Sequence, residues 1–117
     1  MTQYLISFDE GTMIIPEGEL PDVAKAVGEV VDQARDAGVW VFGGGLESQQ
    51  ASVVATDGTV TDGPYPETKE VLGGFAVVEV PSREEALEWA ARLAAACRCP
   101  QDVRELLPDP TTEGGRA

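Results

Sequence analysis

The chain has 117 residues, of which 43% are hydrophobic, and this suits one domain with a modest core while excluding a disordered protein. With 8 basic and 21 acidic residues, the net charge of −13 argues against direct binding to nucleic acid or to an acidic membrane surface. No apolar run approaches the roughly 18 residues of a membrane span, and the N-terminus lacks a signal-peptide pattern, so we expect a cytoplasmic protein.

Histidine is absent from the sequence, and this restricts the chemistry. Without imidazole there is no Ser-His-Asp or Cys-His pair and no histidine metal ligand. The two cysteines, Cys97 and Cys99, do not complete a tetrahedral zinc site on their own, so we expect no metal and no cofactor. Any acid–base chemistry would fall to a carboxylate, to a lysine such as Lys69, or to a tyrosine.

The first predicted elements are a strand, a loop and a helix. Partial alternation of apolar residues predicts a strand over residues 3–8. The loop over residues 9–21 carries an apolar patch at 13–15, which either folds onto the domain or contacts a partner. Pro21 suits the first turn of a helix, apolar residues then recur at helical spacing, and Gly38 supplies the stop.

The middle of the chain is predicted to form short strands. The first covers residues 39–42, and the glycine run 43–45 breaks or bulges it. A second strand follows over residues 51–56. The Asp57-Gly58 pair is a strong hairpin turn signal, so residues 59–61 are expected to fold back on that strand.

A second helix is the clearest element of the C-terminal half. Ser82 and Glu85 have the spacing of a capping box, and the buried stripe that follows extends the helix to about Cys97. The elements around it are a strand over residues 74–80, a last strand over residues 103–107 and a flexible tail over residues 108–117.

The order β-α-β-β-β-α-β predicts an α+β fold of the ferredoxin-like kind, with an antiparallel sheet, two helices on one face and an extra β-hairpin. We expect a single domain over residues 1–107. The strands at 39–42 and 75–78 are apolar on both faces, although two helices cover only one. A second copy, packed sheet against sheet, is the simplest cover, so we expect a homodimer.

The segment from Thr61 to Phe75 is the candidate site, because it places two prolines, a Gly-Gly pair and alternating charges between two apolar runs. Its prolines stiffen a cleft wall on which Tyr65 packs against a planar ligand, and a structural crossover loop is the alternative. Asp62 as a base and Lys69 as an electrostatic partner are the weak catalytic candidates. The predicted ligand-binding residues are Asp62, Gly63, Pro64, Tyr65, Lys69, Gly73, Gly74 and Trp40.

The run from Asp62 to Glu70, followed by Leu72-Gly73-Gly74-Phe75, resembles the signature of the YCII-related family in its DGPF branch, with Tyr65 in place of the phenylalanine. The similarity extends upstream to Ala37 and downstream to Arg104. The resemblance implies a ferredoxin-like fold of the dimeric α/β-barrel type. Some relatives resemble dehydrochlorinases or muconolactone-isomerase-like enzymes with a suggested His/Asp pair. This chain has no histidine for that role, so the chemistry does not transfer.

Three hypotheses for the function follow. The first is a non-catalytic dimer that binds a small molecule or a protein partner in a cleft beside residues 62–74. The second is a small lyase or isomerase that uses Asp62 as its base. The third is an accessory protein for an extracytoplasmic-function sigma factor, because proteins of the family that this chain resembles are often described as transcription-related. The acidic charge of the chain disfavours direct DNA contact.

Overall fold

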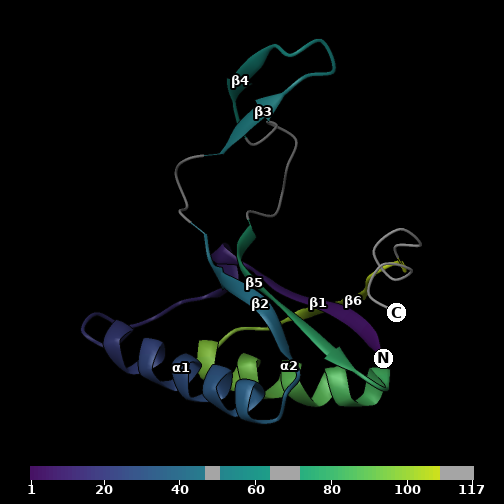
Figure 1. Ribbon diagram of the computed structural model, residues 1–117. Helices are drawn as coiled ribbons and strands as arrows, with labels where there is room; N and C mark the ends of the chain where they lie inside the picture. Colours follow the sequence, from purple (N-terminus) through teal and green to yellow (C-terminus); the bar gives the residue numbers. More distant parts are fainter. Residues whose placement is uncertain (47–50, 64–71, 109–117) are drawn as a thin grey trace.

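The computed structural model describes residues 1–46, 51–63 and 72–108 (Figure 1). Six strands, two α-helices and one short 3₁₀ helix follow one another in these residues. In chain order they are β1 (Thr2–Asp9), η1 (Glu10–Thr12), α1 (Leu20–Asp36), β2 (Trp40–Gly45), β3 (Ser52–Val54), β4 (Val60–Asp62), β5 (Leu72–Val80), α2 (Arg83–Cys97) and β6 (Asp102–Glu105).

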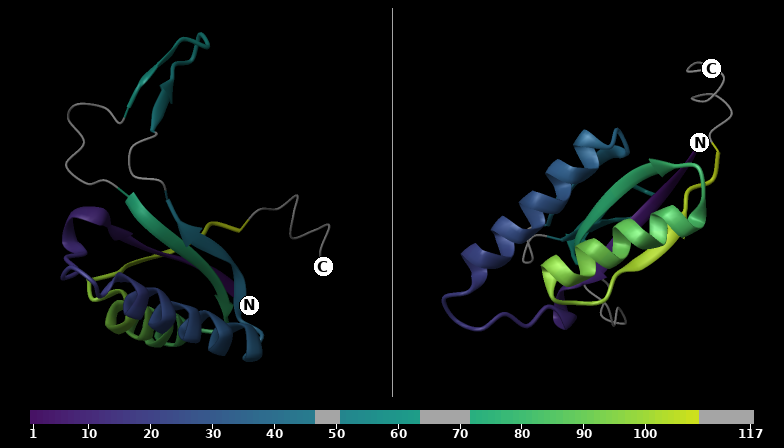
Figure 2. Two further views of the ribbon diagram at one scale, coloured as in Figure 1. Left: turned by 90° about the vertical axis from the view of Figure 1, so that its left-hand side faces the viewer. Right: turned by 90° about the horizontal axis from the view of Figure 1, so that it is seen from below.

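Four strands form one antiparallel sheet in the order β2-β5-β1-β6. Both helices lie on the same face of this sheet (Figures 1 and 2). The central strands β1 and β5 pair along almost their whole length. The edge strands are β2 and β6, each of which ends one β-α-β half of the chain. This is the ferredoxin-like arrangement, so the predicted α+β fold class is confirmed.

Each helix begins and ends where the sequence provides a local signal. The Ser82 hydroxyl accepts a hydrogen bond from the Glu85 backbone N–H at 3.3 Å, which confirms the predicted cap of α2. Arg98 adopts the left-handed conformation at the end of α2, and Gly38 does so after α1, with φ of 61° and 75°. An ion pair between Arg98 and Glu19 joins the end of α2 to the start of α1.

The core lies between the sheet and the helices. Alternate residues of β5 are buried against α2, and Val78 and Val80 are among the most deeply buried side chains of the described residues. The neighbours Phe75 and Val77 point to the other face, which we call the open face. Because β5 is apolar on both sides, the prediction that this strand presents two apolar faces is confirmed.

Two local predictions differ from the structure. Strand β2 continues through the glycine run to Gly45, and its irregularity lies earlier, between Trp40 and Phe42. Backbone pairing with β5 needs no side chain, so the three glycines do not break the strand. The last strand, β6, is Asp102–Glu105 rather than 103–107.

The hairpin is confirmed at its turn and differs in its strands. Gly58 has φ of 90°, and the Ala55 N–H donates to the Thr59 carbonyl at 2.8 Å. β3 is shorter than predicted and β4 begins one residue later, at Val60. The two strands form a separate sheet instead of extending the main one. Of the predicted tail, residues 109–117 lie outside the described residues.

Candidate functional site

Of the predicted cleft residues that the structure describes, Asp62 and Gly63 belong to the hairpin, whereas Gly73, Gly74 and Trp40 belong to the main sheet. Asp62 lies exposed at the end of β4. The Gly63 N–H donates to the Ala51 carbonyl at 2.9 Å and so extends the hairpin ladder. Pro64, Tyr65 and Lys69 lie outside the described residues, so their role as a cleft wall stays a prediction.

Gly73 and Gly74 make room for the ring of Phe8. A Cβ atom on Gly74 would lie 2.8 Å from Phe8 Cε1 and 3.0 Å from the Gly44 carbonyl oxygen. A Cβ atom on Gly73 would also collide with the Phe8 ring. The sequence predicts that this pair binds a ligand, whereas in the structure the Phe8 side chain occupies the space beside the two glycines.

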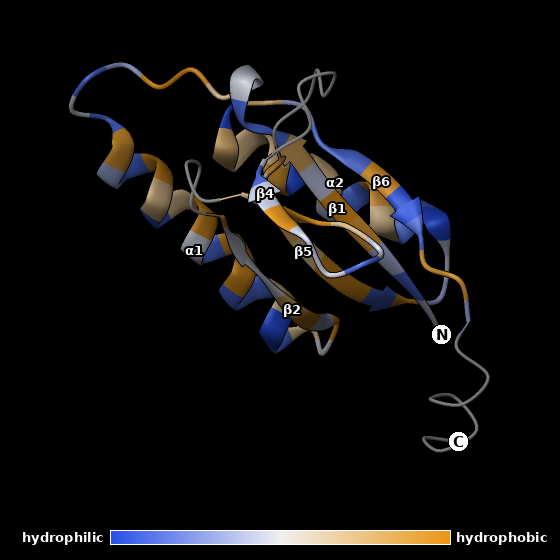
Figure 3. Ribbon diagram, turned by 90° about the horizontal axis from the view of Figure 1, so that it is seen from above, coloured by the Kyte–Doolittle hydropathy of each residue, from blue (hydrophilic) through white to orange (hydrophobic). Residues whose placement is uncertain are grey.

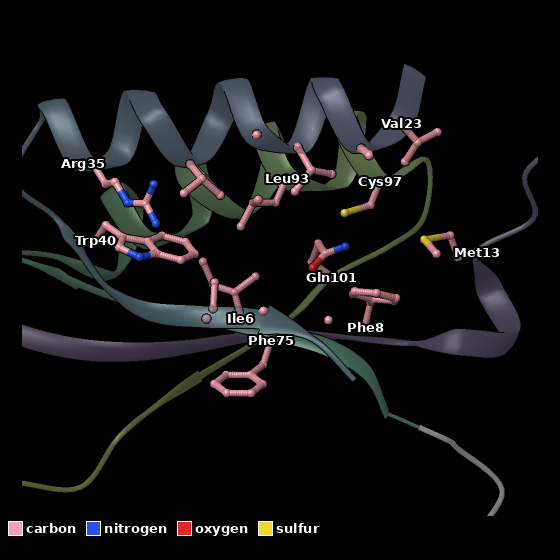
Figure 4. Close-up of a pocket in the computed structure, with 18 of the residues that line it drawn as sticks. Ile6, Phe8, Met13, Val23, Arg35, Trp40, Phe75, Leu93, Cys97 and Gln101 are labelled. Atoms are coloured by element: carbon pink, nitrogen blue, oxygen red, sulfur yellow. The ribbon is translucent and has the colours of Figure 1, made fainter. Parts of the chain in front are cut away.

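Phe8 belongs to the wall of a cavity on the helix side of the sheet. The cavity has a volume of about 450 Å³ and lies between α1 and the strands β1, β2 and β5 (Figure 4). Most of the side chains around it are apolar. They come from α1 (Val23, Val27, Val31), from the strands (Ile6, Phe8, Trp40), from α2 (Leu93, Cys97), and from the segments outside them (Met13, Gln101).

The cavity exists because both of its long walls lack bulk. On α1 the lining includes Ala24 and Gly28, and on β2 it includes the glycine run 43–45. Helix α2 packs on the sheet through small residues such as Ala86 and Ala90, whereas α1 packs chiefly on α2 and stands off the strands. Small residues on facing elements therefore leave a space where a core would otherwise be filled.

Among the predicted site residues that the structure describes, Trp40 alone lines this cavity. Its indole lies over Gly43, where a Cβ atom would come within 2.8 Å of the ring. The Arg35 guanidinium carbon lies 5.8 Å from the centre of the same ring, and Arg35 also reaches Asp32 at 3.8 Å. Since that ion pair is largely exposed, it holds the guanidinium only weakly.

The other polar groups lie near the end of α2. The Gln101 side-chain N–H donates to the Cys99 carbonyl at 3.3 Å, which orients its amide. Burial, and then the neighbouring Cys99, raise the pKa of the Cys97 thiol to about 11. Burial also raises the pKa of Cys99. Both thiols are therefore protonated at neutral pH and are poor nucleophiles.

The side chains that line the cavity include few polar groups. Among the described lining residues there is no carboxylate and no lysine, so the polar groups are those of Arg35 and Gln101, the Cys97 thiol and the Trp40 indole N–H. Within residues 1–46, 51–63 and 72–108, no three Cys, Asp or Glu side chains cluster as metal ligands. None of the helices described is long and apolar enough to cross a membrane.

In the sequence analysis, the valines of α1 serve only as evidence for a helix and are not connected with the glycine run of β2. The valine pattern of α1 is the same whether the facing strands fill the space beside the helix or leave it empty. The available signal was the coincidence of Gly28 in a helix interior with three successive glycines in a strand, because each costs stability where it stands.

The chain belongs to the YCII-related domain family, whose model matches residues 5–98. No curated protein has a significant match to the sequence. Among solved structures, 5-chloro-2-hydroxyhydroquinone dehydrochlorinase (TftG) from Burkholderia phenoliruptrix AC1100, in complex with 2,5-dihydroxybenzoquinone, is similar, with a TM-score of 0.52 and 15% identity. The match covers 93% of this chain and 97% of that chain. At this identity the similarity shows the fold alone.

Proposed function

We propose that this YCII-related protein binds a small, mostly apolar ring compound in the cavity between α1 and the sheet. The observation that carries the proposal is the cavity itself, whose volume of about 450 Å³ lies in the range of small-molecule sites. An unoccupied apolar space of this size costs stability, and a ligand recovers the lost contacts.

The walls favour a flat ligand. Trp40 offers an aromatic face on one side, and the valines of α1 offer a smooth apolar wall on the other. A ring with one hydroxyl or carboxylate group fits the polar groups, because Arg35 donates to an oxygen and the Gln101 amide oxygen accepts from a hydroxyl. Dihydroxybenzoquinone, the ligand in the TftG structure, is a rational first probe on these grounds.

Fluorescence of Trp40 provides a direct test, since the chain has two tryptophans. Trp89 lies on α2, stacked under Arg92 at 4.3 Å, and does not line the cavity. In a Trp89→Phe background, we expect saturable quenching by hydroxybenzoquinones or hydroxybenzoates and no response to short aliphatic acids.

A cavity-filling variant tests the location. Gly28 lines the cavity, and a Cβ atom added to it meets nothing within 4 Å, so Gly28→Leu adds apolar bulk at the cavity wall. We expect it to abolish quenching while the thermal stability is unchanged or higher. Glu29→Leu, at the exposed neighbouring position outside the lining, is the matched control. Equal binding by Gly28→Leu and the parent, or silence of every ring compound, would contradict the proposal.

A further inference from the structure

The cavity beside α1 has the shape of a long groove. Residues of α1 line it from Leu20 to Arg35, a stretch of about 22 Å at the helical rise of about 1.5 Å per residue. Apolar and hydrophilic segments alternate along this helix (Figure 3), and the apolar residues of the lining recur three or four positions apart, on one helix face. The groove therefore follows nearly the whole length of α1.

Strand β2 forms the opposite wall and runs in the reverse direction. Trp40 lies at the Arg35 end, since the guanidinium carbon is 5.8 Å from the centre of the indole ring. Gly45 lies at the other end, in register through β5 with Phe8 of β1. Figure 4 shows Phe8 and Met13 together at this end, away from Arg35. Both walls therefore follow one axis, which leads from the Arg35 end to the Met13 end.

The two ends of the groove differ in charge. Arg35 is the only charged side chain among the described residues that line it. This side chain is 61% exposed, so an anion paired with it keeps part of its hydration and loses little solvation energy. Asp32 competes for the guanidinium only from 3.8 Å and is itself 74% exposed. At the far end, Met13 and Leu20 are apolar, and an unbranched methionine adapts to the shape of what it contacts.

A single ring does not fill this groove. A ring with one carboxylate is shorter than two helical turns, or about 11 Å, whereas the lining of α1 extends over about four turns. If Arg35 holds such a ring, the apolar wall beyond it faces water or empty space, and either costs free energy. An apolar group on the far side of the ring recovers these contacts.

We infer, on the basis of the binding function proposed above, that the ligand of this groove is an amphipathic monoanion. It is an aromatic carboxylate whose acid group pairs with Arg35 at the exposed end and whose apolar tail extends along α1 toward Met13. The ring lies against Trp40, beside the acid group, and the tail passes Val27 and Leu93. Benzoates with a linear alkyl group opposite the carboxylate have this form.

A homologous series tests the length of the ligand. Isothermal titration calorimetry of the full chain measures the affinities of benzoate, para-butylbenzoate, para-hexylbenzoate and para-octylbenzoate. We expect one molecule per chain and a gain of up to about fourfold for each buried methylene, so that para-octylbenzoate binds at least about a hundredfold more tightly than benzoate. A gain of less than about tenfold over the whole series would overturn the inference, as would the uptake of several molecules per chain.

Nuclear Overhauser effects test the direction of the tail. In protein labelled at its methionine methyl groups, we expect the terminal methyl group of para-octylbenzoate to contact Met13, which lines the groove. Met1 is the internal control, because it is 72% exposed at the N-terminus and lies outside the lining residues. The aromatic protons of the ligand should contact Trp40. Contacts of the ring with Met13, or of the terminal methyl group with Trp40, would mean the reverse orientation and contradict the pairing with Arg35.

Arg35→Gln tests the charge of the ligand. Para-butylbenzamide resembles para-butylbenzoate in shape but is neutral, so we expect the variant to weaken the acid about tenfold and to leave the amide within about twofold. Arg92→Gln is the matched control, since Arg92 also lies over a tryptophan, Trp89, but outside the lining residues. Circular dichroism checks that both variants are folded. An equal loss for acid and amide, or no loss for the acid, would show that Arg35 does not select an anion and would refute the inference.

The same measurements separate this ligand class from the binding function itself. If no ring compound binds, with or without a tail, the binding function fails and the ligand class fails with it. If benzoate quenches Trp40 and the alkyl group adds nothing, the binding function stands and the amphipathic ligand is excluded.

Discussion

The two faces of the four-stranded sheet use the same strands in opposite ways. On the covered face, β5 presents Gly74, Ala76 and Val78; Val78 packs in the core, and Ala76 lines the cavity. On the open face, it presents Phe75 and Val77, which stand half-exposed. Because side chains alternate along a strand, one segment lines an internal space on one face and leaves an apolar surface on the other.

The largest difference between the faces is expected from one pair of adjacent valines. Val78 is 1% exposed in the core, whereas Val77 is half-buried on the open face. Val78→Ala should lower the free energy of unfolding by about 2–3 kcal/mol, from lost transfer energy and the cavity left behind. Val77→Ala should cost less than about 1 kcal/mol, because Val77 is only half-buried and its removal leaves no closed cavity. Urea denaturation measures both, and equal losses would contradict the comparison.

Two adjacent glycines of β2, Gly43 and Gly44, extend the comparison to the backbone of the sheet. A Cβ atom on Gly43 would lie 2.6 Å from the Phe75 carbonyl oxygen and 2.8 Å from the Ala76 Cα, so β2 must shift. We expect Gly43→Ala to cost about 1–3 kcal/mol and to change the fluorescence of Trp40. Gly44→Ala meets nothing within 4 Å and should be neutral or slightly stabilising. Thermal denaturation measures whether the stabilities of the two variants differ in this way.

The fold was predictable because its signals are local and agree with one another. The cap at Ser82, the stop at Gly38 and the turn at Asp57-Gly58 each specify a boundary from a few neighbouring residues. The apolar run at 75–78 also indicated correctly that the sheet has two apolar faces. The separation of the hairpin from the main sheet was not predictable, because strand partners are chosen by the whole fold rather than by strand sequence.

The cavity was only partly predictable. Trp40 was named as a site residue, but it was assigned to a cleft with Tyr65 instead of a space beside α1. The spacing of Val27 and Val31 indicates a helix face without revealing its distance from the strands. The unusual positions of Gly28 and of the glycine run are visible in the sequence, but only the structure shows that they line the same cavity.

Titration of Cys97 tests how strongly the covered face excludes water. Burial raises the pKa of this thiol from 9.0 to about 11, so the folded chain holds the proton more tightly than the unfolded chain. Its contribution to stability is therefore complete below pH 9 and is lost as the pH rises toward 11. In Cys99→Ser, where burial remains the main cause, we expect thiolate absorbance to appear well above pH 9. A midpoint at the ordinary thiol value would show that water reaches the cavity wall freely.

Asp57 gives the smallest and most local effect, on the hairpin at the open side. Its carboxylate accepts a hydrogen bond from the Thr59 N–H at 2.9 Å, and this bond holds the pKa of Asp57 below 3.8. The bond favours the charged form, so its contribution to the turn is present above pH 3.8 and is lost as the pH falls through the lower folded pKa.

The Thr59 amide resonance reports this titration, with an expected midpoint below 3.8 that Asp57→Asn removes. In dilute protein the Val78 amide should not respond at that pH, because the hairpin and the main sheet share no ladder of hydrogen bonds. A joint response of both amides would mean that the hairpin and the sheet unfold as one unit. The open face would then be covered within one chain, and the distinction between the two faces would be lost.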